Sequence, residues 1–103
     1  MEIFEIKIIT PQLAESIARL LPQLSANAAI PSIEEMEILL ADNNSHLYVA
    51  EQDGVVAGML SLVIVNIPTG RKAWIEDVVV DVGFRGKNIG FELVERAKVE
   101  AQN

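Results

Sequence analysis

The stretch Ala73–Lys98 reads AWIEDVVVD, VGFRGKNIG and FELVERAK in succession, and it combines the three signals that decide the fold. The first part is rich in β-branched residues, including Val78 to Val80, which favour a β-strand. Its continuous apolar run predicts a strand that is buried on both faces. The middle part has the glycines and polar residues of a tight loop. The last part predicts a helix, because Ile89, Leu93 and Ala97 recur at helical spacing.

The loop between this strand and this helix has the features of a phosphate-binding site. The first turn of a helix leaves backbone N–H groups without partners at the positive end of the helix dipole. Glycine lets a ligand approach the backbone because it has no Cβ atom, and the loop contains Gly83, Gly86 and Gly90. Arg85 and Lys87 add positive charge. A simple strand-to-helix connection is the alternative, because a glycine-rich loop alone is a weak signal.

The segment Arg85–Gly90, RGKNIG, resembles the acyl-CoA pyrophosphate loop of the GCN5-related N-acetyltransferases, the GNAT family. The family pattern is Arg or Gln, two residues, Gly, one residue and then Gly or Ala. Arg85 fits the first position and Gly90 the last, whereas Asn88 stands where the middle Gly is expected. The preceding WIEDVVVD resembles the fourth strand of the family, which commonly reads I-E-D followed by an apolar run.

The N-terminal part of the chain predicts one strand and two helices. β-Branched residues dominate residues 2–9 and favour a strand. Thr10-Pro11 is a typical helix start, and Pro22 is expected to bend or end that helix. Ser32 and Glu35 have the spacing of a capping box, which predicts the start of a second helix.

The central part predicts a β-hairpin that leads into the strand at Ala73. Residues 46–51 and 55–65 are two apolar segments joined by Asp53-Gly54, a hairpin turn signal, and Gly58 marks a bulge or a close approach. The order is therefore β-α-α-β-β-β-α, an α+β fold with a largely antiparallel sheet. It resembles the acyl-CoA N-acyltransferase fold without its C-terminal strands and helix. Residues 1–103 are accordingly expected to form a single GNAT-like domain that is incomplete at its C-terminus.

Composition narrows the possible partners and locations. The net charge of −7 argues against nucleic-acid binding. No apolar run reaches the roughly 18 residues of a membrane span, so no membrane partner is expected. Without cysteine or a signal peptide the expected location is cytoplasmic. Six of the eight basic residues lie between Arg71 and Lys98, which places the positive charge around the loop.

The resemblance implies that acetyl-CoA is the co-substrate. Its pyrophosphate would bind the loop residues, which are Arg85, Gly86, Lys87, Asn88, Ile89 and Gly90. Backbone groups of Val78, Val79 and Val80 would hold the pantetheine arm, and one N–H would polarise the thioester carbonyl. Side chains that serve only as core are the alternative for the valines, and both roles are compatible.

Glu76 is the candidate general base, because the Glu of the I-E-D segment often has this role in the family. An ammonium group must lose a proton before it attacks a thioester. A solvent-facing Glu is the alternative. Asp77 is expected on the opposite strand face, with a structural role. His46 has no second His or Cys nearby in the pattern, so no metal site is expected. Trp74 and Tyr48 are expected to be packing residues.

The predicted function is direct acetyl transfer from acetyl-CoA to a primary amine of a small molecule or a peptide. The alternatives are a non-catalytic acyl-CoA-binding or interaction module and an inactive fragment of a longer acetyltransferase. The strand Ala73–Asp81 is expected to lie at an open sheet edge, which favours association of two copies. A homodimer is therefore expected.

Overall fold

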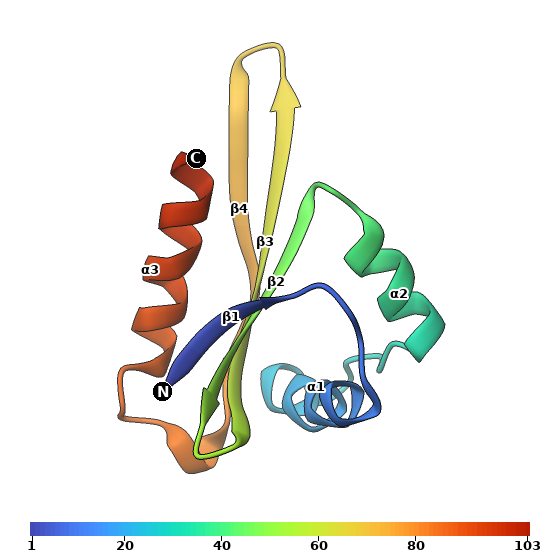
Figure 1. Cartoon of the computed structure of the whole chain (residues 1–103), viewed down its shortest axis with the longest axis vertical. Helices are drawn as coiled ribbons and strands as arrows, with labels where there is room; N and C mark the ends of the chain where they lie inside the picture. The colour runs from blue at the N-terminus through green and yellow to red at the C-terminus, as the bar shows by residue number, and fades with distance from the viewer.

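The computed structural model describes residues 1–103 and contains a four-stranded sheet, three α-helices and one 3-10 helix (Figure 1). In chain order these elements are β1 (Glu2–Ile6), α1 (Pro11–Leu24), α2 (Ile33–Ala41), β2 (Ser45–Gln52), β3 (Val55–Ile67), β4 (Gly70–Val80), η1 (Val82–Phe84) and α3 (Ile89–Gln102). The order β-α-α-β-β-β-α predicted from the sequence is confirmed.

The strands form an antiparallel sheet in the order β1-β2-β3-β4, with helices on both faces (Figure 1). α1 and α2 cover one face, and α3 covers the other. The apolar core is divided in the same way. One cluster contains Leu20 and Met36 below α1 and α2, and the other contains Tyr48 and Leu93 below α3.

The first two helices begin at the residues that the capping signals predicted. Thr10 Oγ1 accepts a hydrogen bond from the Leu13 N–H at 3.1 Å. Ser32 and Glu35 form a reciprocal capping box, with bonds of 3.1 and 2.9 Å. Pro22 lies inside the last turn of α1, which continues to Leu24. None of the α-helices has both the length and the apolar character needed to cross a membrane.

Gly58 lies where β3 passes close to α3. A Cβ atom at this position would be 3.1 Å from the Val79 carbonyl oxygen, 3.2 Å from Leu93 Cδ1 and 3.3 Å from Ile89 Cγ2. The register between β2 and β3 also shifts beside it. The close approach predicted for this glycine is confirmed, and it allows α3 to pack directly on the sheet.

β4 is exposed along most of its length, so the prediction of a strand buried on both faces is wrong for residues 73–77. Only Val79 is buried, and the valines on either side of it are half-buried. β4 is an edge strand, and its hairpin with β3 projects beyond the helices (Figure 1). Trp74, expected to be packed, is therefore 50% exposed, whereas Tyr48 is buried as predicted.

Candidate functional site

A β-bulge in β4 changes the face on which Asp77 lies. Ser61 of β3 pairs with Glu76, and the next pair joins Met59 to Val79, so β4 has one more residue than β3 between these pairs. Asp77 has a φ of 51°, in the left-handed region that Asp tolerates better than most residues. Glu76 and Asp77 consequently line the same cavity, and the prediction that they face opposite sides is wrong.

This cavity and a larger one adjoin each other between the sheet and α1 and α2. Their volumes are about 250 and 470 Å³. Four residues line both of them: Leu39, Leu47, Ser61 and Asp77. We call the two together the acidic cavity, because Glu35, Glu76 and Asp77 line it, whereas no lysine or arginine does.

The carboxylates of Glu76 and Asp77 have no counter-charge in the structure. The ion pairs of the chain join other residues, and both carboxylates are exposed at the edge of the sheet. Sequence reasoning missed the position of Asp77 at a bulge beside the cavity. The available signal was an Asp, a poor strand former, inside a run of β-branched residues, which is typical of an irregularity such as a bulge.

The loop between β4 and α3 has unpaired donors where a phosphate group is expected to bind. The backbone N–H groups of residues 86–91 donate no hydrogen bond, as is usual at a helix N-terminus. Gly86 and Asn88 have φ values of 85° and 62°. Asn88 thus adopts the left-handed conformation for which the family pattern uses Gly, and Asn is among the residues that tolerate it.

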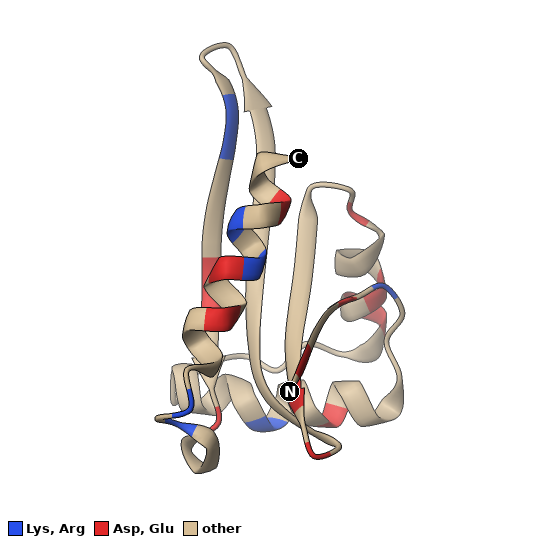
Figure 2. Ribbon diagram, turned by 60° about the vertical axis from the view of Figure 1, so that its left-hand side comes forward, with Lys and Arg blue, Asp and Glu red and all other residues tan.

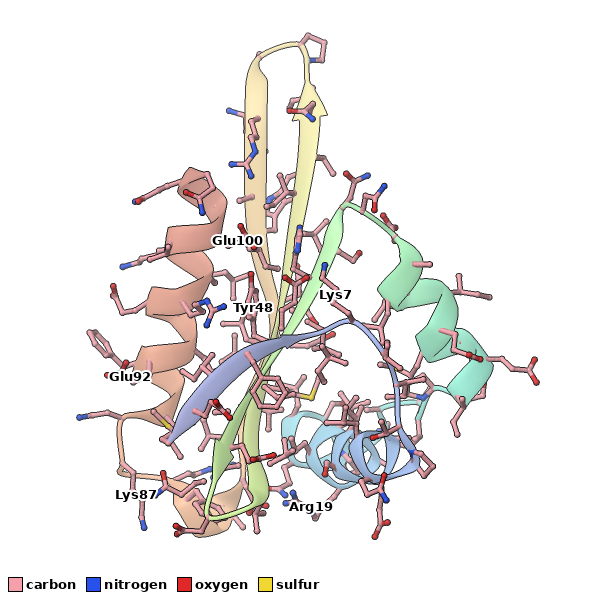
Figure 3. The ribbon with its side chains drawn as sticks, viewed as in Figure 1. Lys7, Arg19, Tyr48, Lys87, Glu92 and Glu100 are labelled. Carbon is pink, nitrogen blue, oxygen red and sulfur yellow. The ribbon has the colours of Figure 1, made fainter.

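The two cations of the loop point in different directions. Arg85 Nε donates to the Val80 carbonyl oxygen at 3.2 Å, so this side chain lies against the end of β4. Lys87 Nζ lies 5.8 Å from the centre of the Phe84 ring, on the outer side of the loop (Figure 3). Neither cation forms an ion pair. Figure 2 shows this positive loop at the base of α3, away from the acidic segment of β4.

Helix α1 holds the segment that leads into the loop. Arg19 forms an ion pair with Asp81, and Gln23 Oε1 accepts a hydrogen bond from the Val82 N–H at 2.8 Å. Asp81 also accepts a bond from the Gly83 N–H at 2.9 Å. Gln23 and Val82 are 59 residues apart in the sequence, so no local pattern could predict this connection.

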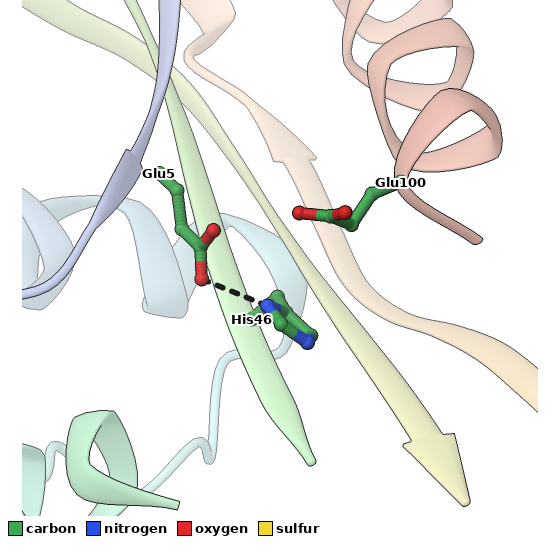
Figure 4. A group of neighbouring side chains, drawn as sticks. All are labelled: Glu5, His46 and Glu100. Carbon is green, nitrogen blue, oxygen red and sulfur yellow. Dashed lines mark hydrogen bonds and ion pairs between the residues drawn. The ribbon is translucent and has the colours of Figure 1, made fainter. Parts of the chain in front are cut away.

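The only histidine lies in a polar cluster on the α3 face, which consists of Glu5, His46 and Glu100 (Figure 4). His46 Nδ1 and Lys7 Nζ each lie 2.8 Å from Glu5 Oε2. The Tyr48 hydroxyl donates to Glu100 Oε1 at 3.0 Å, and these two side chains face each other between sheet and helix (Figure 3). The potential ligand atoms lie within 4.8 Å of one another, so this set could hold a metal ion.

The carboxylates of Glu5 and Glu100 in this cluster already accept hydrogen bonds from other side chains of the chain. Burial acts to raise the pKa of Glu5, but hydrogen bonds from Lys7 and His46 outweigh it and hold this pKa below its ordinary value. Burial, and then the hydrogen bond to Glu100, raise the pKa of the Tyr48 hydroxyl. The cluster therefore joins α3 to β1 and β2.

The structure places the predicted cofactor residues along one path. The Val78–Val80 segment lies on the open edge of β4, and the Arg85–Gly90 loop follows it and leads into α3. Glu76 lies at the other end of the valine segment, beside the acidic cavity. The functional roles of these residues stay predictions at this point.

Known proteins that resemble this chain indicate its family. The chain matches the Acetyltransferase (GNAT) family model over residues 13–103. No curated protein matches it. A similar solved structure is an aminoglycoside acetyltransferase from an uncultured soil metagenomic sample, with a TM-score of 0.85 and 23% identity over 98% of this chain and 69% of that chain.

Two other solved structures, both of acetyltransferases, also resemble this chain. The glucosamine-6-phosphate N-acetyltransferase from Arabidopsis thaliana has a TM-score of 0.80 and 26% identity, over 99% of this chain and 76% of that chain. The ribosomal-protein-alanine N-acetyltransferase from Brucella melitensis biovar Abortus 2308 has a TM-score of 0.75 and 24% identity, over 98% of this chain and 71% of that chain. The shared architecture confirms the α+β fold predicted from the sequence.

The family match covers all elements from α1 to α3, including the bulged edge strand and the loop at the N-terminus of α3. Fold and family match thus agree with the two motifs in the sequence. The chain therefore belongs to the GNAT family of acetyltransferases.

Proposed function

We propose that this chain transfers an acetyl group from acetyl-CoA to an amine of a small molecule or a peptide. The observation that carries the proposal is the set of unpaired N–H groups at residues 86–91, next to two unpaired cations and directly after the open edge of β4. A helix N-terminus of this kind favours a pyrophosphate. A pantetheine arm that extends from it can follow the edge of β4 towards Glu76.

The transfer would be a direct reaction in one ternary complex. The amine nitrogen attacks the thioester carbonyl carbon, the C–S bond breaks, and CoA leaves as a thiolate that takes up a proton. Before the attack, Glu76 would accept a proton from the ammonium form of the acceptor, directly or through water, which frees the lone pair of the amine nitrogen. An N–H group of the Val78–Val80 segment would stabilise the negative charge on the carbonyl oxygen.

Two alternative functions predict the same loop but no reaction. They are a non-catalytic acyl-CoA-binding module and an inactive piece of a longer acetyltransferase. The chain spans 69% of the aminoglycoside acetyltransferase and 76% of the glucosamine-6-phosphate enzyme. The proposal of catalysis therefore depends on the residues along β4 and α3 being sufficient for turnover.

Two measurements on the same preparation separate these functions. Calorimetry measures CoA binding, and thiol release from acetyl-CoA is followed with a panel of amines. The proposed enzyme binds CoA and releases thiol only when an amine is present. CoA binding without amine-dependent release supports a binding module or an inactive piece of a longer enzyme, and failure to bind CoA overturns both the enzyme and the binding module.

A further inference from the structure

We propose that the acceptor is a cationic amine with an apolar body, and that its ammonium group binds beside Glu76 and Asp77 in the acidic cavity. The inference rests on the proposed acetyl transfer and names the acceptor class for it. Three properties of the cavity support it, namely its charge, its apolar walls and the absence of lysine and arginine.

The charges at the cavity favour a cation. Glu76 and Asp77 are neighbours in the chain, and neither has an ion-pair partner. Two adjacent carboxylates without a counter-ion repel each other and attract an ammonium group. The bulge matters here, because a regular strand would place Asp77 on the opposite face of the sheet.

The walls of the cavity favour an apolar body. The larger part has a volume of about 470 Å³, within the range of about 300–1,000 Å³ that is typical of small-molecule sites. Most of its lining side chains are hydrophobic, and they include Leu21, Met36 and Met59. An aliphatic or aromatic group is stabilised there by removal from water. The hydroxyl groups of a sugar would find few polar side chains there, namely Ser25, Glu35, Ser61 and Asp77, so much of a sugar's polar surface would lie against apolar walls.

The absence of lysine and arginine from the cavity disfavours anionic acceptors. His46 lines its smaller part, but its Nδ1 is already bonded to Glu5 Oε2. A phosphorylated or carboxylated amine would bring negative charge next to Glu35, Glu76 and Asp77, and no lysine or arginine of the cavity could compensate it. The unpaired cations Arg85 and Lys87 lie in the loop before α3 and do not line the cavity. An amino sugar phosphate is therefore a poor fit.

Binding is measured in the absence of acetyl-CoA, so that the result does not depend on turnover. Trp74 is the only tryptophan, it is exposed, and it pairs with the lining residue Val63. Its fluorescence therefore reports on a ligand in the cavity, with calorimetry as a second readout. Phenethylamine is compared with phenethyl alcohol, phenylalanine and glucosamine 6-phosphate. We expect phenethylamine to bind at least about tenfold more tightly than each of the others, and added salt to weaken its binding.

Charge-neutral variants locate the ammonium group. Asp77→Asn retains the size of the side chain and tolerates the positive φ, and Glu76→Gln is the equivalent change at its neighbour. Each should weaken phenethylamine binding about 1.5- to 5-fold, as expected for exposed charge pairs, and should leave binding of the alcohol unchanged. Glu37→Gln is the matched control, because Glu37 is exposed on α2 and lines neither part of the cavity.

The outcomes separate the acceptor class from the proposed enzyme. Amine binding that depends on Asp77, without acetylation, supports the acceptor site and overturns the proposed activity. Acetylation with a preference for phosphorylated amines supports the activity and overturns this inference. Equal binding of phenethylamine and its alcohol, or no binding of either, also overturns it.

Discussion

Acidic side chains have hydrogen-bond or ion-pair partners on one face of the sheet and lack a counter-charge on the other. On the α3 face, Glu5 accepts a hydrogen bond from His46 (Figure 4) and another from Lys7, and Glu100 accepts one from a buried tyrosine. On the face covered by α1 and α2, Glu76 and Asp77 have no counter-charge and line a largely apolar cavity.

This difference separates charges that hold the fold together from charges that are available to a ligand. A paired and partly buried carboxylate links two elements, so its loss affects stability. An exposed, unpaired carboxylate contributes little to stability, so its loss affects only what it binds or deprotonates. The comparison therefore predicts that substitutions on the two faces change different properties.

Glu76→Gln should have the largest effect, and it should act on catalysis and amine binding but not on stability. At neutral pH the rate of acetyl transfer should fall about 100-fold, as is typical for loss of a general base, whereas stability against urea should not change. The loss should be smaller at high pH, where the free amine is abundant. An unchanged pH–rate profile would exclude Glu76 as the base.

Gly90→Val tests the cofactor loop. A Cβ atom at Gly90 would meet only Val80 Cγ2, at 3.5 Å. The family pattern accepts Ala at this position, so a bulkier side chain is needed to fill the space proposed for the pyrophosphate. CoA affinity should fall about tenfold, or about 1.4 kcal/mol. Gly83→Val is the matched control, since a Cβ atom at Gly83 would lie 3.6 Å from Asp81 Oδ1. Equal affinities of both variants in calorimetry would contradict the placement.

Glu5→Gln should destabilise the fold by about 1 kcal/mol at neutral pH and leave acetyl transfer unchanged. The folded-state pKa of Glu5 lies below its unfolded value. Its stabilisation is therefore complete above the unfolded pKa of about 4.3 and is lost as the pH falls through the lowered folded pKa. Urea unfolding at a series of pH values measures the difference. A difference that persists unchanged in strong acid would show that ionisation of Glu5 is not the cause.

Asn88→Gly should tighten CoA binding about threefold, because it removes a Cβ atom from a position that needs positive φ. Asn88 already has the required φ of 62°, so the backbone does not have to change and the gain is small. Calorimetry on both forms measures it. If binding does not tighten, the Asn88 side chain is not what limits affinity.

We also propose that two copies associate through the open edge of β4 at residues 73–77, which would leave the Val78–Val80 edge free for the pantetheine arm and would double the measured mass. Trp74 and Ile75 are exposed in this part of the strand, which contains no proline or lysine that would prevent pairing. Light scattering after size exclusion, over a wide dilution range, measures the mass. Ile75→Lys should give a monomer, whereas Ile38→Lys, at an exposed position on α2, should not. A stable wild-type monomer at all dilutions would contradict the proposal.

Features encoded by neighbouring residues could be predicted from the sequence. The caps at Thr10 and Ser32, the turn at Asp53-Gly54 and the loop after β4 each depend on a few consecutive residues, and the structure contains all of them. The left-handed conformation of Asn88 was likewise foreseeable, because the family pattern places a glycine there.

Features that depend on strand pairing or on distant segments could not be predicted. The bulge at Asp77 exists because β4 has one more residue than β3 between two paired positions. The sequence of β4 alone does not show how its residues pair with those of β3. The exposure of Trp74 likewise depends on how far the hairpin projects beyond the helices. The acidic cavity needs side chains from both N-terminal helices and from three strands.

Helix α1 contacts both proposed ligand sites. Arg19 and Gln23 hold the segment before the cofactor loop, while Ile17 and Leu21, on the same helix, line the acidic cavity. A displacement of α1 caused by one ligand would therefore reach the site of the other. Thermodynamic linkage then requires reciprocity, so that acetyl-CoA changes the affinity for the amine by the same factor by which the amine changes the affinity for acetyl-CoA. One ion pair, Arg19 with Asp81, and one amide, that of Gln23, would then set the cooperativity of the proposed two-substrate reaction.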